Sequence, residues 1–273
     1  MIASENHAIP QTYQDVADRA GQRPRRALYY LISAALLFTL WQISVMLTSE
    51  SARRFLIPTP AAVAARFVSL IRSGTLAHHT GVTLLEMGLG LSVGTSVALI
   101  LGYMVAHSHL IAALVEPVIA FSQAIPIVAL APLLTVWFGS GITSKVVVCA
   151  LIVSFPILVN VTTGLKNIDP RLHDLFRLLD ANRAQTLLQL EIPAALPAIL
   201  AGLKVGGTMA GMGAVVGEFV ASTEGLGYMV KQGQNLYDLP MMFVAIFCLM
   251  IIASAIYALF TLLEHTLLRW QSH

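Results

Sequence analysis

The stretch from Met241 to Phe260 reads MMFVAIFCLMIIASAIYALF and decides the class of this protein. It is apolar at nearly every position, so a helix formed from it would have no polar face. A helix of about 20 such residues crosses the hydrocarbon core of a bilayer, because a helix satisfies every backbone group within one segment. A β-barrel would instead show short segments of alternating polarity. The stretch therefore predicts an all-α membrane protein.

The composition of the whole chain agrees with this class. Of 273 residues, 57% are hydrophobic and 11% are charged, whereas a soluble globular domain carries about a quarter charged residues. These values exclude a soluble enzyme and a disordered chain. The two cysteines lie inside apolar runs, which argues against a disulfide scaffold. A net charge of +2 is too small to indicate a nucleic-acid partner.

The sequence predicts a polytopic helical bundle with about six transmembrane helices. The basic cluster Arg23–Arg26 precedes the first span and should hold that end in the cytoplasm, and an even number of spans places both termini there. On this topology ten of the sixteen Lys and Arg residues are cytoplasmic. Residues 1–26 would form a cytoplasmic tail and 27–273 one transmembrane domain. The expected spans are 28–48, 83–106, 115–138, 143–165, 198–220 and 240–263.

Two connections between the spans are longer than turns. In the outer one, Thr59 can cap a helix whose first residue is Pro60, and Gly74 follows its expected end. We expect this helix to lie along the membrane surface as a structural strut.

The inner connection, about 166–197, carries the most information. Asp169 can cap a helix that begins at Pro170, and a break is expected at Asp180 and Ala181. Asn182 then resembles the start of a capping box. Prolines at 193 and 197 should interrupt the helix before the fifth span. One helix face would carry Leu172, Leu175, Phe176 and Leu179.

The pattern of the inner connection leaves two interpretations open. Two short amphipathic helices joined by a turn could fill the groove of a soluble partner, or they could lie on the lipid headgroups as a helical hairpin.

The inner connection resembles the EAA loop of ATP-binding-cassette (ABC) importer permeases of the binding-protein-dependent type. Its closing half, Ile192–Pro197, fits the Leu-Pro and further Pro of that loop. Its opening half departs from it, because Asp174 stands for the Glu, Leu175 and Phe176 for the two Ala, and Asp180 for the usual Gly. Asp tolerates the left-handed backbone region better than most residues do, so the turn can survive.

A wider resemblance runs from about residue 57 onward and points to the nitrate, sulfonate, taurine and vitamin-precursor branch of this family. The motifs that carry it are Pro58-Thr59-Pro60, Pro126–Pro132 leading to Trp137-Phe138-Gly139 and Gly141, Gly217-Glu218, and Gly225–Tyr228.

The resemblance implies the fold of a type I ABC importer permease, two copies of which form the path of a small solute. That solute would be a small anion such as a sulfonate, nitrate or taurine, or a vitamin precursor such as a pyrimidine or riboflavin. The implied partners are a cytoplasmic ABC ATPase dimer, an extracytoplasmic solute-binding protein and a second permease subunit, all at a plasma or inner membrane. The residues expected to contact the ATPase are Leu172, Asp174, Leu175, Phe176, Leu179, Asp180, Arg183, Pro193 and Pro197.

Polar groups inside spans are costly and are therefore candidates for the translocation path. The candidates are Gln123, Asn160 and Glu218, although the first two could instead hydrogen-bond between helices and Glu218 could reach outer water. Glu86 and Glu116 lie near span ends, where we expect them to be interfacial. The fifth span carries glycines four residues apart, a spacing that lets helices pack closely within one subunit or at a pore-lining dimer contact.

Motifs that would mark an enzyme are missing from the sequence. It contains no Gly-x-x-x-x-Gly-Lys-Ser/Thr phosphate loop and no His-Glu-x-x-His motif, and its eight histidines form no metal-binding pattern. We therefore expect a transport subunit with no catalytic residues, metal or cofactor of its own, and ATP bound by the partner chain. A rival hypothesis is an ATP-independent channel or an ion-coupled carrier. The scarcity of charge within the spans disfavours the carrier.

Overall fold

A computed structural model describes residues 29, 32–33, 35–48, 57–124 and 127–268. The chain divides into two compact units, 1–62 and 63–273. In the first unit an apolar helix covers Ala35–Leu47, and the indole N–H of Trp41 donates to the Pro58 carbonyl across 3.1 Å. The expected tail 1–26 lies outside the described residues, as do several residues of the first predicted span.

Helices make up the regular structure of the described residues. Four of the apolar segments are long enough to cross a membrane, namely Thr75–His107, Ile142–Lys166, Arg183–Val220 and Leu239–Leu267. The elements in chain order are α3 (Pro60–Arg72), α4 (Thr75–His107), α5 (His109–Ala124), α6 (Ile127–Phe138), α7 (Ile142–Lys166), α8 (Pro170–Leu178), α9 (Arg183–Thr186), the π-helical turn η1 (Leu187–Glu191), α10 (Ile192–Ala221), α11 (Leu226–Asn235) and α12 (Leu239–Leu267).

The predicted helix after Thr59 is confirmed as α3. The Thr59 hydroxyl accepts from the Ala62 amide at 3.2 Å, and Gly74 follows the helix with a φ of 74°, a conformation that glycine adopts without steric cost.

Two predicted spans have different limits in the structure. The second begins at Thr75 rather than at residue 83. The third, 115–138, is not one helix but two shorter ones, α5 and α6. Pro126 falls between them in the sequence, and a proline both lacks a backbone donor and disfavours helical geometry at the residue before it.

Glycines bring the four long helices into close contact. A Cβ on Gly90 of α4 would lie 2.4 Å from Cys149 Sγ of α7, and one on Gly213 of α10 would lie 2.7 Å from Cys149 Cα. A Cβ on Gly207 would meet Phe260 of α12 at 2.5 Å. Helices in lipid associate through such close backbone packing, because the hydrophobic effect between them is weak. The glycines of the fifth span therefore pack within the subunit.

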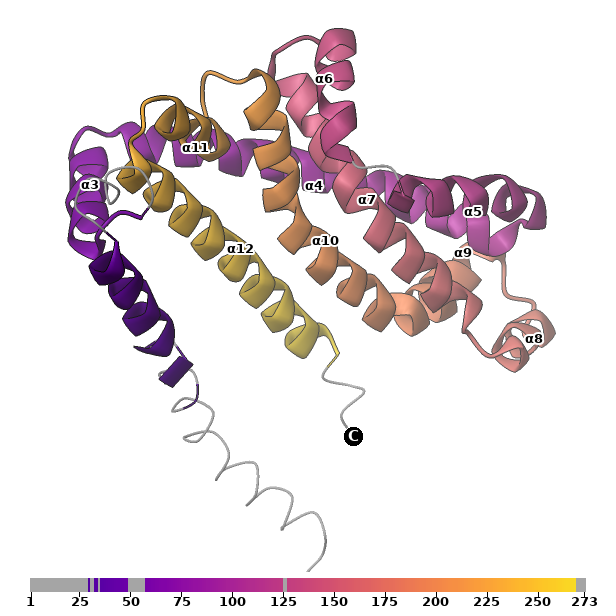
Figure 1. Ribbon diagram of the computed structural model, residues 1–273. Coiled ribbons are helices and arrows are strands. Elements are labelled where there is room, and N and C mark those ends of the chain that lie inside the picture. The colour runs from indigo at the N-terminus through magenta and orange to yellow at the C-terminus, as the bar shows by residue number, and fades with distance from the viewer. Residues whose placement is uncertain (1–28, 30–31, 34, 49–56, 125–126, 269–273) are drawn as a thin grey trace, which may run out of the picture. The chain divides into compact units, whose positions relative to one another are not determined.

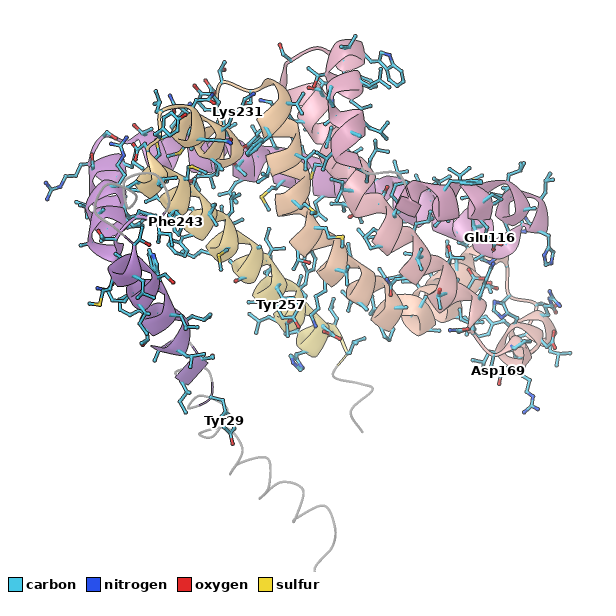
Figure 2. All side chains as sticks on the ribbon, in the orientation of Figure 1. Tyr29, Glu116, Asp169, Lys231, Phe243 and Tyr257 are labelled. Atoms are coloured by element: carbon cyan, nitrogen blue, oxygen red, sulfur yellow. The ribbon has the colours of Figure 1, made fainter. Side chains whose placement is uncertain are left out.

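The long helices give the second unit two distinct ends, as Figure 1 shows for α7, α10 and α12. We call the end that carries α8 the α8 end, and the opposite one the α11 end. Asp169 marks the first and Lys231 the second in Figure 2. α12 finishes at the end where α10 begins, because Lys204 of α10 and Glu264 of α12 form an ion pair at 2.6 Å.

Candidate functional site

The helix at the α8 end begins as the sequence predicts. The Asp169 side chain accepts from the Arg171 amide at 2.9 Å, and Pro170 is the first helical residue. This cap satisfies one of the free amides of the first turn, so a helix of only nine residues has a defined start.

α8 exposes its apolar side chains instead of burying them. None of its residues is buried, and Phe176 is half-buried. The exposed leucines are Leu172 (40%), Leu175 (48%), Leu178 (82%) and, just past its end, Leu179 (69%). An apolar face that the subunit leaves open is typical of a surface that a partner covers.

The turn after α8 takes the left-handed backbone conformation that glycine adopts most readily. Asp180 adopts a φ of 54°, and the Ala181 amide donates to the Phe176 carbonyl at 3.0 Å. The capping box is also present: Asn182 Oδ1 accepts from the Gln185 amide, and Gln185 Oε1 accepts from the Asn182 amide, at 2.9 and 2.8 Å. Asp180 therefore makes the turn despite replacing the usual Gly.

The predicted interruption by the prolines is wrong. Helix continues from Arg183 through Val220, with Pro193 in the first turn of α10 and Pro197 inside it. The π-helical turn η1 ends directly before Ile192. A proline in a helix removes one i→i−4 hydrogen bond and crowds the preceding turn, and a wider turn at that place lets the helix run on.

A cluster of polar residues lies at the α11 end, with Glu218 at its centre. The Glu218 side chain is fully buried. Its Oε1 accepts from the Thr83 hydroxyl of α4 at 2.7 Å, and its Oε2 accepts from the backbone amides of Gly227 and Tyr228 in α11. The carboxylate thus holds the first turn of α11 against α4 and α10, where the free amides of a helix N-terminus favour negative charge.

Side chains of the same cluster also hold the loop before α11 through its backbone amides. The Gly225 amide donates to His79 Nδ1 at 2.9 Å, and the Leu226 amide donates to the Thr83 hydroxyl at 2.8 Å. Gly225 has a φ of 106°, and a Cβ there would lie 2.2 Å from Glu218 Cδ. Only glycine can bring the backbone this close to the carboxylate.

Sequence reasoning missed a buried ion pair in this cluster. Glu86, expected to be interfacial, is 1% exposed, and its Oε1 lies 3.1 Å from Lys145 Nζ of α7. Lys145 also donates to the Ser222 hydroxyl at 2.7 Å. The sequence did offer a signal for this pair, because Glu86 and Lys145 are an acidic and a basic residue near the corresponding ends of two predicted spans. Glu116, in contrast, is exposed and pairs with Lys166 at 2.9 Å.

Two of the three candidates for the translocation path, Asn160 and Glu218, lie far apart. Asn160 is half-buried, and its Nδ2 donates to the Pro156 carbonyl of its own helix at 2.8 Å. By helical rise it lies about 22 Å along α7 from Lys145, which packs against Gly217, the residue before Glu218 in α10. Gln123 belongs to α5, and its side chain lies outside the described residues.

Comparisons with known proteins agree with this architecture. Residues 94–269 match the family model described as "Binding-protein-dependent transport system inner membrane component". The chain is 43% identical to the riboflavin transport system permease protein RibX of Chloroflexus aurantiacus, over 90% of this chain and 91% of that protein. It is 32% identical to the formylaminopyrimidine transport permease protein ThiX of Halalkalibacterium halodurans, over 92% and 98%.

A solved structure shares the fold. A chain of the MetNI methionine ABC transporter, in an inward-facing conformation, superimposes with a TM-score of 0.63 at 18% identity, over 72% of this chain and 97% of that one.

Proposed function

Because the chain belongs to the family of inner membrane components of binding-protein-dependent transport systems, we propose that two copies form the translocation path of an ATP-driven importer. The chain is a multi-pass membrane permease, a transport component and not an enzyme. An extracytoplasmic binding protein delivers the solute, and a separate cytoplasmic ATPase dimer binds and hydrolyses ATP.

The exposed leucines of α8 carry the assignment of the ATPase contact. They lie on a helix that is capped at its start and followed by a fixed turn, so the face is presented in one orientation. Leu172, Leu175, Phe176 and Leu179 supply apolar burial in a cleft of the ATPase, and Asp174, Asp180 and Arg183 supply polar contacts at its rim. Pro193 and Pro197 belong to the helix that carries the movement into the bundle.

On this proposal the α8 end faces the cytoplasm. The charge bias of the sequence supports this orientation, since ten of sixteen Lys and Arg residues then lie on the cytoplasmic side. The C-terminal helix α12 ends on the same side, and an even number of spans puts the N-terminus there as well.

A planar nitrogen heterocycle is the solute class that the relatives favour. The relatives at 43% and 32% identity are named for riboflavin and for formylaminopyrimidine, and both molecules carry a flat, nitrogen-containing ring with hydrogen-bonding edges. Small anions such as sulfonates, nitrate or taurine are the competing solutes. Gln123, Asn160 and Glu218 remain our candidates for residues of the translocation path.

The ATPase contact is tested by Leu179→Asp in the full permease, co-expressed with its ATPase. A buried, unpaired carboxylate is costly in an apolar cleft, so the variant should insert normally but lose most of the co-purifying ATPase. Leu236→Asp is the matched control, because Leu236 is also an exposed leucine (65%) but lies at the α11 end. Undiminished ATPase with Leu179→Asp would refute the contact.

The solute is tested by uptake into proteoliposomes that hold the permease and ATPase, with the binding protein supplied outside. We expect uptake of labelled riboflavin, of labelled formylaminopyrimidine, or of both, in which case each should compete with the other. Taurine should neither enter nor compete. Uptake that needs no ATPase or ATP would favour the channel or carrier instead.

A further inference from the structure

Three elements meet at one buried carboxylate at the α8 end. Glu191, the last residue of η1, is 4% exposed. Its Oε1 accepts from His107 Nε2, at the end of α4, across 2.9 Å, and from His173 Nε2 of α8 across 3.3 Å. We call these three residues the Glu191 joint.

Contacts within α4 fix the orientation of the His107 ring in the Glu191 joint. His107 Nδ1 lies 2.9 Å from the Tyr103 carbonyl one turn back in α4, so both ring nitrogens of His107 contact oxygen acceptors. The imidazole also lies against the Tyr103 ring, with centroids 4.2 Å apart. The Glu191 carboxylate is therefore held by a rigid group at the end of a long helix.

The surroundings of α8 make this polar link important. α8 buries none of its own residues fully, and Phe176 is its half-buried apolar side chain, so little apolar packing fastens it to the bundle. Instead a cavity of about 470 Å³ lies among α4, α8 and the α9–η1 segment, lined by Tyr103, His107, His173, Arg177, Arg183 and Glu191. A helix beside a cavity can shift as a body, and His173 is the side chain of α8 that reaches Glu191.

The position of Glu191 in a π-helical turn adds to the argument. η1 lies between the short α9 and the long α10, and single π turns are common at functional sites in helices. A displacement of α8 passed to Glu191 is thereby applied to the start of α10 and, through His107, to the end of α4.

We propose that Glu191 is the positioning residue through which movement of α8 reaches α4 and α10, with His173 as its contact on α8. This inference rests on the proposed function, in which α8 is the element that the ATPase moves. It predicts that breaking the joint separates ATP hydrolysis from transport and leaves ATPase binding intact.

The first variant is His173→Ala in the assembled permease–ATPase complex. His173 is half-buried on a helix without buried residues, so its loss should not unfold the bundle. We expect ATPase co-purification and ATP hydrolysis within about twofold of the unaltered complex, and ATP-driven uptake lower by roughly tenfold, the size expected for a hydrogen bond to a charged group. His109→Ala is the matched control: His109 is exposed and lies two residues from His107.

Glu191→Gln is the second variant, with Glu116→Gln as its control, because Glu116 is an exposed carboxylate whose partner is Lys166. The amide keeps the shape of the side chain but weakens both hydrogen bonds, since bonds to a charged acceptor are about twice as strong as neutral ones. Uncoupling should again appear in Glu191→Gln and not in Glu116→Gln.

Spin-label distances separate this inference from the proposed function. In a Cys248→Ser background, one label per subunit is placed at Arg171→Cys on α8, which is exposed and lies outside the proposed contact residues, or at Ile100→Cys on α4. Distances between subunits are then measured with and without ATP and vanadate. In the unaltered joint both distances should change with nucleotide, whereas in His173→Ala and Glu191→Gln only the α8 distance should change.

Each result has a defined meaning. An α8 distance that does not respond in the unaltered joint refutes the ATPase contact itself. A full α4 response or normal uptake in both joint variants overturns the role of Glu191 while leaving the ATPase contact standing. If Glu191→Gln fails to assemble, His173→Ala alone decides.

Discussion

Glu218 of α10 accepts a hydrogen bond from Thr83 of α4 across 2.7 Å, and both side chains are fully buried. The same Thr83 hydroxyl accepts from the Leu226 amide at 2.8 Å. Two long helices and the start of α11 are therefore joined through one hydroxyl and one carboxylate. This arrangement gives the α11 end a polar centre, as Glu191 does at the α8 end.

Replacing Glu218 with Ala should loosen α11 without separating the long helices. Each buried donor left without its acceptor costs about 1–3 kcal/mol, whereas the glycine contacts between α7 and α10 are unaffected. We expect faster hydrogen exchange at the Gly227 and Tyr228 amides, by tenfold or more, and reduced uptake with normal ATPase co-purification. Glu264→Ala, at the α8 end, should leave those amides protected. Unchanged exchange in Glu218→Ala would contradict the assignment.

Gly225→Ala should destabilise the protein more than Gly139→Ala does. Both glycines have positive φ, 106° and 80°. With a ψ of 165°, Gly225 also lies in a region that is essentially restricted to glycine, so a side chain there carries a strain of about 1–3 kcal/mol. A Cβ at Gly139 meets nothing within 4 Å, while one at Gly225 falls 2.2 Å from Glu218 Cδ. Thermal unfolding in detergent should show the larger loss for Gly225→Ala, and equal melting temperatures would refute this packing.

Lys145→Met should be strongly destabilising, because it leaves the buried Glu86 carboxylate without its counter-charge. Breaking a buried ion pair from one side costs about 3–5 kcal/mol, whereas replacing both partners is often nearly neutral. We therefore expect the double variant Glu86→Gln/Lys145→Met to recover most of the lost melting temperature. A double variant no more stable than Lys145→Met would show that Lys145 acts mainly through Ser222.

Asp180→Gly and Asp180→Val should have opposite effects on the turn after α8. At a φ of 54° glycine is free of steric cost, and a β-branched side chain is strongly disfavoured. Hydrogen exchange of the Ala181 amide should slow slightly in Asp180→Gly and accelerate in Asp180→Val, which should also retain less ATPase. Equal exchange in the two variants would mean that the turn does not need the left-handed conformation.

Local sequence signals predicted the α8 end well. The cap at Asp169, the turn at Asp180 and the capping box at Asn182 depend on side chains that bond to backbone groups two or three residues away, so they can be read from the chain alone. The prolines were misjudged because the sequence carries no sign of the π-helical turn that precedes Pro193.

The long-range contacts could not be read in this way. Glu86 and Lys145 are 59 positions apart in the sequence, and Glu191 meets His107 across 84. The residues next to Glu86 or Glu191 in the sequence do not identify the partner of either, because the partner depends on which faces of the helices pack together.

The sequence by itself determined that this protein is a helical membrane protein with a capped amphipathic helix between its fourth and fifth predicted spans, since apolar length and caps are local properties. The tertiary structure alone decided that Glu218 secures α11 and that Glu191 links α8 to α4. Both carboxylates are buried, and a buried charge is stable only where the fold brings donors to it from other elements.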